Sequence, residues 1–118
     1  MANELTLRAS LGFSKGNAKV RRTDGISVTV TGETFTHEVQ SIGTSEEDIV
    51  YCADIGTPGY VFIKNLDATN YVELGITAGV YTIKLQAGEF ALYRHNNAAW
   101  KAKATGGACL MEFTLIET

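Results

Sequence analysis

Apolar and polar residues alternate with a period of two along most of this chain. The alternation is clearest in the second half, where short runs separated by turn residues read as strands, at residues 60–64, 70–76, 80–85, 89–94, 98–104 and 109–116. Successive side chains of a strand point to opposite faces, so each run places an apolar set on one side. The sets predicted to face inward include Val72, Leu74 and Ile76, then Tyr81, Ile83 and Leu85, and then Trp100, Ala102 and Ala104.

The first half shows the same period with different turn signals. Leu5, Leu7 and Ala9 alternate with polar residues, and residues 14–17 (SKGN) then have the composition of a turn. An Asp-Gly pair at residues 24–25 predicts a further turn, followed by a half-buried strand that contains Ile26, Val28 and Val30. Residues 34–40 predict another strand, with Phe35, His37 and Val39 on one face.

Helix signals are weak throughout. Thr44 or Ser45 could cap a single helical turn, with the acidic residues 46–48 at its positive end. No periodic run of ten residues supports anything longer, and the strand runs recur about every ten residues. We therefore expect an all-β fold: a single-domain antiparallel β-sandwich, jelly-roll-like, over residues 1–118, with residues 1–10 as an extended arm or edge strand.

The last strand differs from the others because it is apolar on both sides. Cys109, Met111, Phe113 and Leu115 alternate with a second set that includes Leu110 and Ile116. A strand of this kind is typical of the centre of a sheet, or of a surface that a partner covers.

Charge and hydropathy exclude several classes of function. The formal net charge is −3, so the broad cationic field that dominates non-specific nucleic-acid binding is missing, and we expect no nucleic-acid partner. No run of 18 apolar residues and no signal peptide is present, which predicts synthesis in the cytosol and no membrane partner. One basic run, residues 19–22, fits a solvated strand end or a contact with an acidic partner, which makes Arg21 and Arg22 candidate contact residues.

Candidate chemistry is sparse. His37 and Glu38 are adjacent on a strand and point to opposite faces, so they cannot act as an acid–base pair; we expect His37 to be partly buried and His95 to face solvent in a turn. The acidic run lacks the alternate oxygen ligands of a calcium loop, and Cys52 and Cys109 are expected to be buried free thiols. We therefore predict no catalytic residue, no metal and no cofactor.

The connection at residues 65–70 (NLDATN) is the most distinctive loop. Its Asn and Asp side chains can bond neighbouring backbone amides and fix a rigid turn, and the alternative is a contact with a carbohydrate or partner through Asn65, Asp67 and Asn70. The aromatic residues present the same choice between core packing and a sugar-binding platform. They are Tyr51, Tyr60, Tyr71, Tyr81, Tyr93 and Trp100.

Several strings carry a family resemblance. They are QSIGTSEE at 40–47, GYVFIKNLDATNYVELG at 59–75, LQAGEFALYR at 85–94 and MEFTLIE at 111–117. With residues 5–16, they resemble a group of small virion proteins of tailed bacteriophages. These strings are strands and turns, so the resemblance brings no catalytic residue with it.

The resemblance implies a structural component of the phage particle, made in the host bacterial cytoplasm. We expect a capsid cement or decoration protein on the capsid surface, which binds the major capsid protein between capsomers and forms a homo-oligomer, a dimer or trimer. The alternative is a tail or fibre component that binds a host-surface glycan through its tyrosines and the 65–70 loop.

Overall fold

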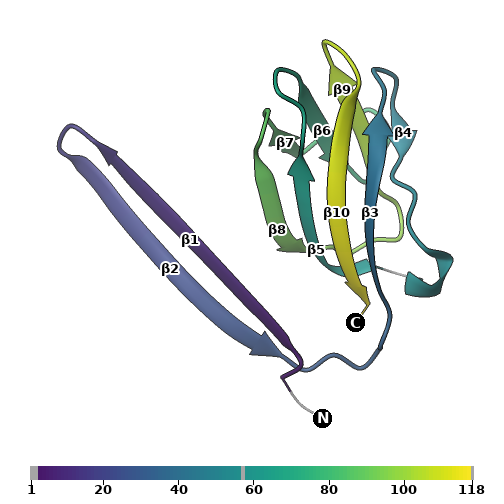
Figure 1. Cartoon of the computed structure of the whole chain (residues 1–118), viewed down its shortest axis with the longest axis horizontal. Helices are drawn as coiled ribbons and strands as arrows, with labels where there is room; N and C mark the ends of the chain where they lie inside the picture. Colours follow the sequence, from purple (N-terminus) through teal and green to yellow (C-terminus); the bar gives the residue numbers. More distant parts are fainter. Residues whose placement is uncertain (1–2, 57, 118) are drawn as a thin grey trace. The chain divides into compact units, whose positions relative to one another are not determined.

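In the computed structural model, which describes residues 3–56 and 58–117, the chain forms strands connected by turns. It divides into two compact units, Met1–Gly32 and Glu33–Thr118 (Figure 1). All strand pairs between named strands are antiparallel, which confirms the predicted all-β antiparallel class. The sandwich lies within the second unit, whereas the prediction extended it over residues 1–118.

The first unit is a β-hairpin. Strand β1 (Leu5–Lys15) pairs with β2 (Ala18–Val28) over eleven residues without a register shift. The tight turn between them uses Gly16 at a φ of 58°, a conformation that glycine adopts without a steric penalty. The turn predicted at residues 24–25 is wrong, because both residues lie inside β2, opposite Ala9 and Arg8. The Asp24 carboxylate accepts a local hydrogen bond from the Gly25 N–H, 2.9 Å away, without reversing the chain.

Over its described residues, 33–56 and 58–117, the second unit contains eight strands in two four-stranded sheets, in the orders β3-β10-β5-β8 and β4-β9-β6-β7. Counted inward from the two ends of the unit, strands pair as nested partners: β3 with β10, β4 with β9, β5 with β8, and β6 with β7. The strands are β3 (Phe35–Ile42), β4 (Glu47–Asp48), β5 (Pro58–Asn65), β6 (Tyr71–Gly75), β7 (Ile83–Leu85), β8 (Phe90–Arg94), β9 (Lys101–Thr105) and β10 (Cys109–Glu117).

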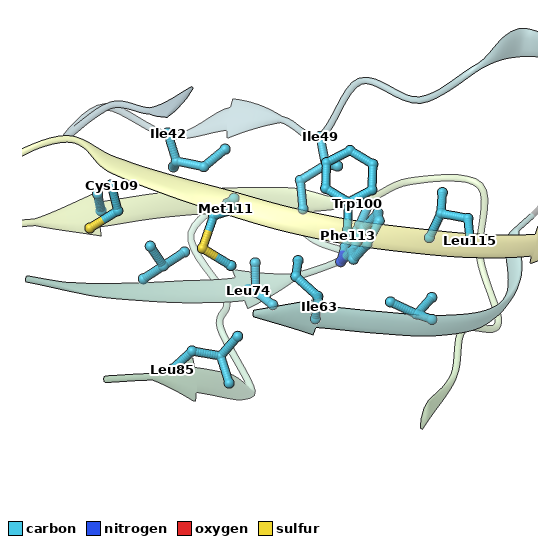
Figure 2. Close-up of a cluster of buried hydrophobic side chains, with 14 of the residues drawn as sticks. Ile42, Ile49, Ile63, Leu74, Leu85, Trp100, Cys109, Met111, Phe113 and Leu115 are labelled. Carbon is cyan, nitrogen blue, oxygen red and sulfur yellow. The ribbon is translucent and has the colours of Figure 1, made fainter. Parts of the chain in front are cut away.

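The two sheets enclose one hydrophobic core (Figure 2). The alternation in the sequence placed most of it correctly: Val72, Leu74, Leu85 and the inward sets of β9 and β10 are buried. The predicted burial of Ile76 is wrong: 47% of its surface is exposed, because β6 ends at Gly75. The chain crosses between the sheets at residues 106–108, since β9 pairs with β4 and β6 while β10 pairs with β3 and β5.

The helical turn predicted after Thr44 is replaced by β4, which pairs with β9. The acidic side chains are engaged elsewhere: the Glu47 carboxylate accepts a hydrogen bond from the Gly43 N–H at 2.9 Å and another from the Gln40 amide at 3.1 Å. In the described residues, the one helical segment is the 3₁₀ turn Ala53–Ile55, and no helix is long and apolar enough to cross a membrane.

Glu46 forms hydrogen bonds with the connection between β6 and β7. Its carboxylate accepts hydrogen bonds from the Gly79 N–H at 2.7 Å and the Tyr81 hydroxyl at 2.6 Å. These donors favour the charged form, so they lower the pKa of Glu46, and the carboxylate raises the pKa of Tyr81 to about 12.

We expect Glu46 to contribute to the acid sensitivity of the fold. Because its folded-state pKa is lowered, its contribution is present above the unfolded-state pKa and is lost as the pH falls through the folded-state pKa. Glu46→Gln should therefore lower the free energy of unfolding at pH 7 and have a smaller effect at pH 3, as measured by urea denaturation at both values. An equal loss at both values would contradict this role.

Candidate interaction surfaces

One sheet has an apolar outer side. The side of β3-β10-β5-β8 that faces away from the core, here called the outer face, follows from the alternation of buried and exposed residues and from the strand registers. Its members are Phe35, His37, Val39 and Ser41 on β3; Leu110, Glu112, Thr114 and Ile116 on β10; Tyr60, Phe62 and Lys64 on β5; and Phe90, Leu92 and Arg94 on β8.

Several large hydrophobic residues of the outer face are strongly exposed in the single chain, while Leu92 and Ile116 are partly buried. Phe35 is 67% exposed, Phe90 60% and Val39 54%. The Phe35, His37 and Val39 set was correctly predicted to share a face, but His37 is exposed rather than partly buried. The opposite side of β3 carries half-buried polar residues and ends in the buried core residue Ile42; its Gln40 amide bonds the carbonyl of Asp48 and the N–H of Val50.

Side chains on the outer face are held by contacts with one another. The Phe62 and Phe90 rings stack with centroids 5.4 Å apart, and the Arg94 guanidinium lies over the Tyr60 ring and donates to its hydroxyl at 3.2 Å. His37 Nδ1 lies 2.7 Å from the Thr114 hydroxyl. Ordered aromatic and arginine side chains lose little freedom on binding, which is why they dominate protein interfaces.

The corresponding side of the other sheet, β4-β9-β6-β7, is charged and polar. Asp48 and Lys101 form an ion pair there at 2.6 Å, and Lys84 lies over the Tyr71 ring. Its remaining members are Glu73, Lys103 and Thr105. Only one of the two sheets of this unit therefore presents a hydrophobic exterior.

The hairpin of the first unit also has two unlike sides. One, the hairpin's apolar face, carries Leu5, Leu7, Ala9, Leu11, Phe13 and Lys15 opposite Val28, Ile26, Asp24, Arg22, Val20 and Ala18. The other, the hairpin's polar face, carries Thr6, Arg8, Ser10, Gly12 and Ser14 opposite Ser27, Gly25, Thr23, Arg21 and Lys19. Leu11 is 62% exposed and Phe13 49%. The hairpin is thus an amphipathic ribbon.

The candidate contact residues Arg21 and Arg22 lie on opposite faces of this ribbon. Arg21 belongs to the polar face, opposite Gly12, while Arg22 lies opposite Leu11 on the apolar face. The Arg22 guanidinium is 3.9 Å from the Asp24 carboxylate, and both side chains are highly exposed. Arg21 is therefore the residue whose charge is presented away from the apolar side chains.

The 65–70 loop is organised by its own side chains. Asn65 is fully buried, and its amide donates to the carbonyls of Asn70, Leu85 and Gln86 at 3.0, 3.1 and 3.3 Å. The Asp67 carboxylate accepts hydrogen bonds from the N–H groups of Asn70 and Thr69. Both bonds lower the pKa of Asp67, and the bond from Asn70 has the larger effect. The structure thus gives Asn65 a role in the fold, and its amide has no contact with solvent.

Besides His37, one histidine and one cysteine are placed differently from expectation. His95 is buried rather than solvent-facing, because its ring packs 5.2 Å from the Trp100 ring and its Nε2 lies 3.0 Å from the Ala99 carbonyl oxygen. Cys52 is exposed, whereas Cys109 is buried as expected. Over residues 3–56 and 58–117, no three His, Cys, Asp or Glu side chains are grouped to hold a metal ion.

The tyrosines are distributed over separate surfaces. Tyr51 and Tyr93 pack against the core, Tyr60 lies on the outer face, and Tyr71 lies on the other sheet. Tyr81 bonds Glu46. These rings therefore do not share one platform on which a sugar could stack.

Comparison of the chain with protein-family models, curated proteins and solved structures found no match. The surfaces must therefore be interpreted from their own chemistry. The double-sided character of β10 was predicted from the sequence, but the outer face as a whole was not. The available signal was the apolar pair Phe35 and Val39, which alternates with the polar residues Thr36, Glu38 and Gln40.

Proposed function

We propose that this protein is a structural component of a tailed-bacteriophage virion, and specifically a cement protein that binds the major capsid protein between capsomers. The observation that carries the proposal is the amount of apolar surface exposed on two different elements, the hairpin and the outer face. Contiguous exposed hydrophobic patches are rare on proteins that remain single, and they mark sites of assembly. A cement stabilises the assembled shell because it binds that state in preference to its alternatives.

The strand order supports the same proposal by analogy. We infer that the nested pairing of β3 with β10 through β6 with β7 is the connectivity of an eight-stranded jelly roll. This double-sheet architecture recurs in viral capsid proteins, but also in lectins, so it favours an assembly role without specifying one.

The hairpin's polar face is the surface that we assign to the capsid. Arg8, Lys19 and Arg21 share this face, and a cationic ribbon would be attracted to acidic patches on a shell protein. This assignment retains Arg21 as a contact residue, as the basic run in the sequence suggested.

Separate sedimentation with isolated heads and isolated tails tests the proposal. We expect the protein to co-sediment with heads, and we expect Arg21→Glu to weaken this binding at least tenfold, or about 1.4 kcal/mol. Lys84→Glu is the matched control, since it makes the same charge change on the other sheet and should bind normally. Sedimentation with tails alone would overturn the cement role and favour the tail component, whose glycan binding an array of host polysaccharides would then detect.

A further inference from the structure

Among residues 3–56 and 58–117, no further strand or helix of either unit covers the hairpin's apolar face or the outer face within that unit. The hairpin consists of two strands only, and an isolated two-stranded hairpin is marginally stable at best in water. Its apolar side chains gain stability only if something packs against them. The outer face has the same need, because Phe35, Val39 and Phe90 lie on the side of the sheet opposite the core.

We propose that the hairpin of one copy packs with its apolar face on the outer face of a second copy, and that the second copy reciprocates to form a closed two-fold dimer. The contact would be a sheet-on-sheet packing with apolar side chains between the layers, at a spacing of about 10 Å. The proposal concerns the free protein, so it would stand even if the capsid role did not.

The opposite net charges of the two units favour this pairing at long range, while the two contacting faces each carry charges of both signs. Five of the ten basic residues but only two of the thirteen acidic residues lie in Met1–Gly32, so this unit has a formal charge of +3 and the remainder of the chain has −6. Two hairpins would repel each other, as would two sandwich units, whereas a hairpin and a sandwich unit attract. Opposite charges of this size speed encounter and disfavour the two like-with-like dimers.

The area available is that of an ordinary dimer interface. A ribbon of two eleven-residue strands measures about 37 Å by about 10 Å, so one hairpin covers roughly 300–400 Å² on each partner. One such contact would be small for a stable complex, but two reciprocal contacts bury roughly 1,200–1,600 Å², which lies within the standard range. Reciprocity also covers every apolar face in the dimer and leaves no open end for further growth.

Packing in this way would leave the hairpin's polar face exposed. Arg8, Lys19 and Arg21 would then lie on the exterior of the dimer, available to an acidic partner. The two proposals therefore use opposite sides of the same ribbon and can be tested separately.

Four exposed positions of the full-length chain provide matched variants. Phe13→Asp places a carboxylate on the hairpin's apolar face, and Ser14→Asp places it on the polar face one residue away. Val39→Asp alters the outer face, and Thr105→Asp alters the exposed side of the other sheet. Light scattering and sedimentation equilibrium give the mass and the dissociation constant, and the fluorescence of the single tryptophan checks that the sandwich is folded.

We expect the wild-type chain, Ser14→Asp and Thr105→Asp to dimerise equally. Phe13→Asp and Val39→Asp should each weaken the dimer more than 100-fold, because the two-fold interface buries two unpaired carboxylates. The decisive measurement is an equimolar mixture of these two variants with different mass tags. The intact hairpin of the Val39→Asp chain should pack on the intact outer face of the Phe13→Asp chain. The mixture should therefore form a heterodimer through this single contact, weaker than the wild-type dimer but tighter than the homodimer of either variant.

Four outcomes would overturn the proposal. A wild-type chain that stays monomeric would indicate that each hairpin folds onto its own chain or remains free. Dimers unaffected by both substitutions would place the interface elsewhere. A dimer that is lost in only one of the two variants, as hairpin–hairpin or face–face contacts predict, or a mixture that forms no heterodimer would exclude the hairpin-on-face contact.

Discussion

Replacement of Phe113 by alanine is expected to lower the free energy of unfolding of the sandwich by about 3–5 kcal/mol, the usual cost of truncating a buried aromatic residue. Phe113 is 1% exposed, and its ring meets the Trp100 ring edge-on at 5.6 Å. It lies on β10, which pairs with β3 on one side and β5 on the other. The cavity would therefore open between three strands and the facing sheet, where little can move to fill it.

Phe35→Ala is the control, because it makes the same chemical change on the outer face. Phe35 is exposed in the single chain, so at dilutions where the protein is monomeric we expect a loss below about 1 kcal/mol. Urea denaturation followed by Trp100 fluorescence reports both values, since the only tryptophan lies in the sandwich core. Similar losses for the two variants would mean that the assignment of the core side of this sheet is incorrect.

The same pair of phenylalanines shows what alternation can and cannot predict. On β10 the sequence correctly identified Cys109, Met111, Phe113 and Leu115 as one set, and this set is buried. On β3 it correctly grouped Phe35 with Val39, but their side of the strand faces away from the core. Period two separates the two sides of a strand; which side is covered depends on pairing with strands far away in the sequence, here Leu110 with Ser41 and Glu112 with Val39.

The separate hairpin formed by β1 and β2 was not predicted, for a related reason. Its strands have the same period as those of the sandwich, so the pattern did not show that β1 and β2 pair only with each other. The Asp24-Gly25 pair suggested a turn. In the structure the chain turns at Gly16 instead, and the resulting register pairs Asp24 and Gly25 with β1 in an extended strand. Similarly, the burial of His95 depends on Trp100, and a turn composition of Arg-His-Asn-Asn gave no sign of this contact.

Replacement of Asn65 by alanine is expected to destabilise the loop at residues 65–70 strongly. The sequence indicated a loop fixed by Asn and Asp side chains, and the structure places the buried Asn65 amide at its centre, with its side-chain oxygen accepting from the Asp67 N–H at 2.9 Å. Asn65→Ala removes this acceptor and the amide donor to the Leu85 carbonyl, while the Gln86 carbonyl keeps its bond from the Glu89 N–H. We expect a loss of about 2–4 kcal/mol in the free energy of unfolding, because unpaired buried polar groups retain their desolvation cost.

Asn65→Asp distinguishes lost hydrogen bonds from a lost shape, because aspartate has nearly the same size. A carboxylate at this position would face carbonyl oxygens in place of a donor, so its folded-state pKa should be raised above the ordinary aspartate value of about 3.9. A raised pKa means that the aspartate is tolerated best below its unfolded-state pKa and that stability is lost as the pH rises through the folded-state pKa. The difference in unfolding free energy from the wild type should therefore be larger at pH 7 than at pH 4, as measured by urea denaturation. A difference that stays constant between the two pH values would contradict the donor role of the Asn65 amide.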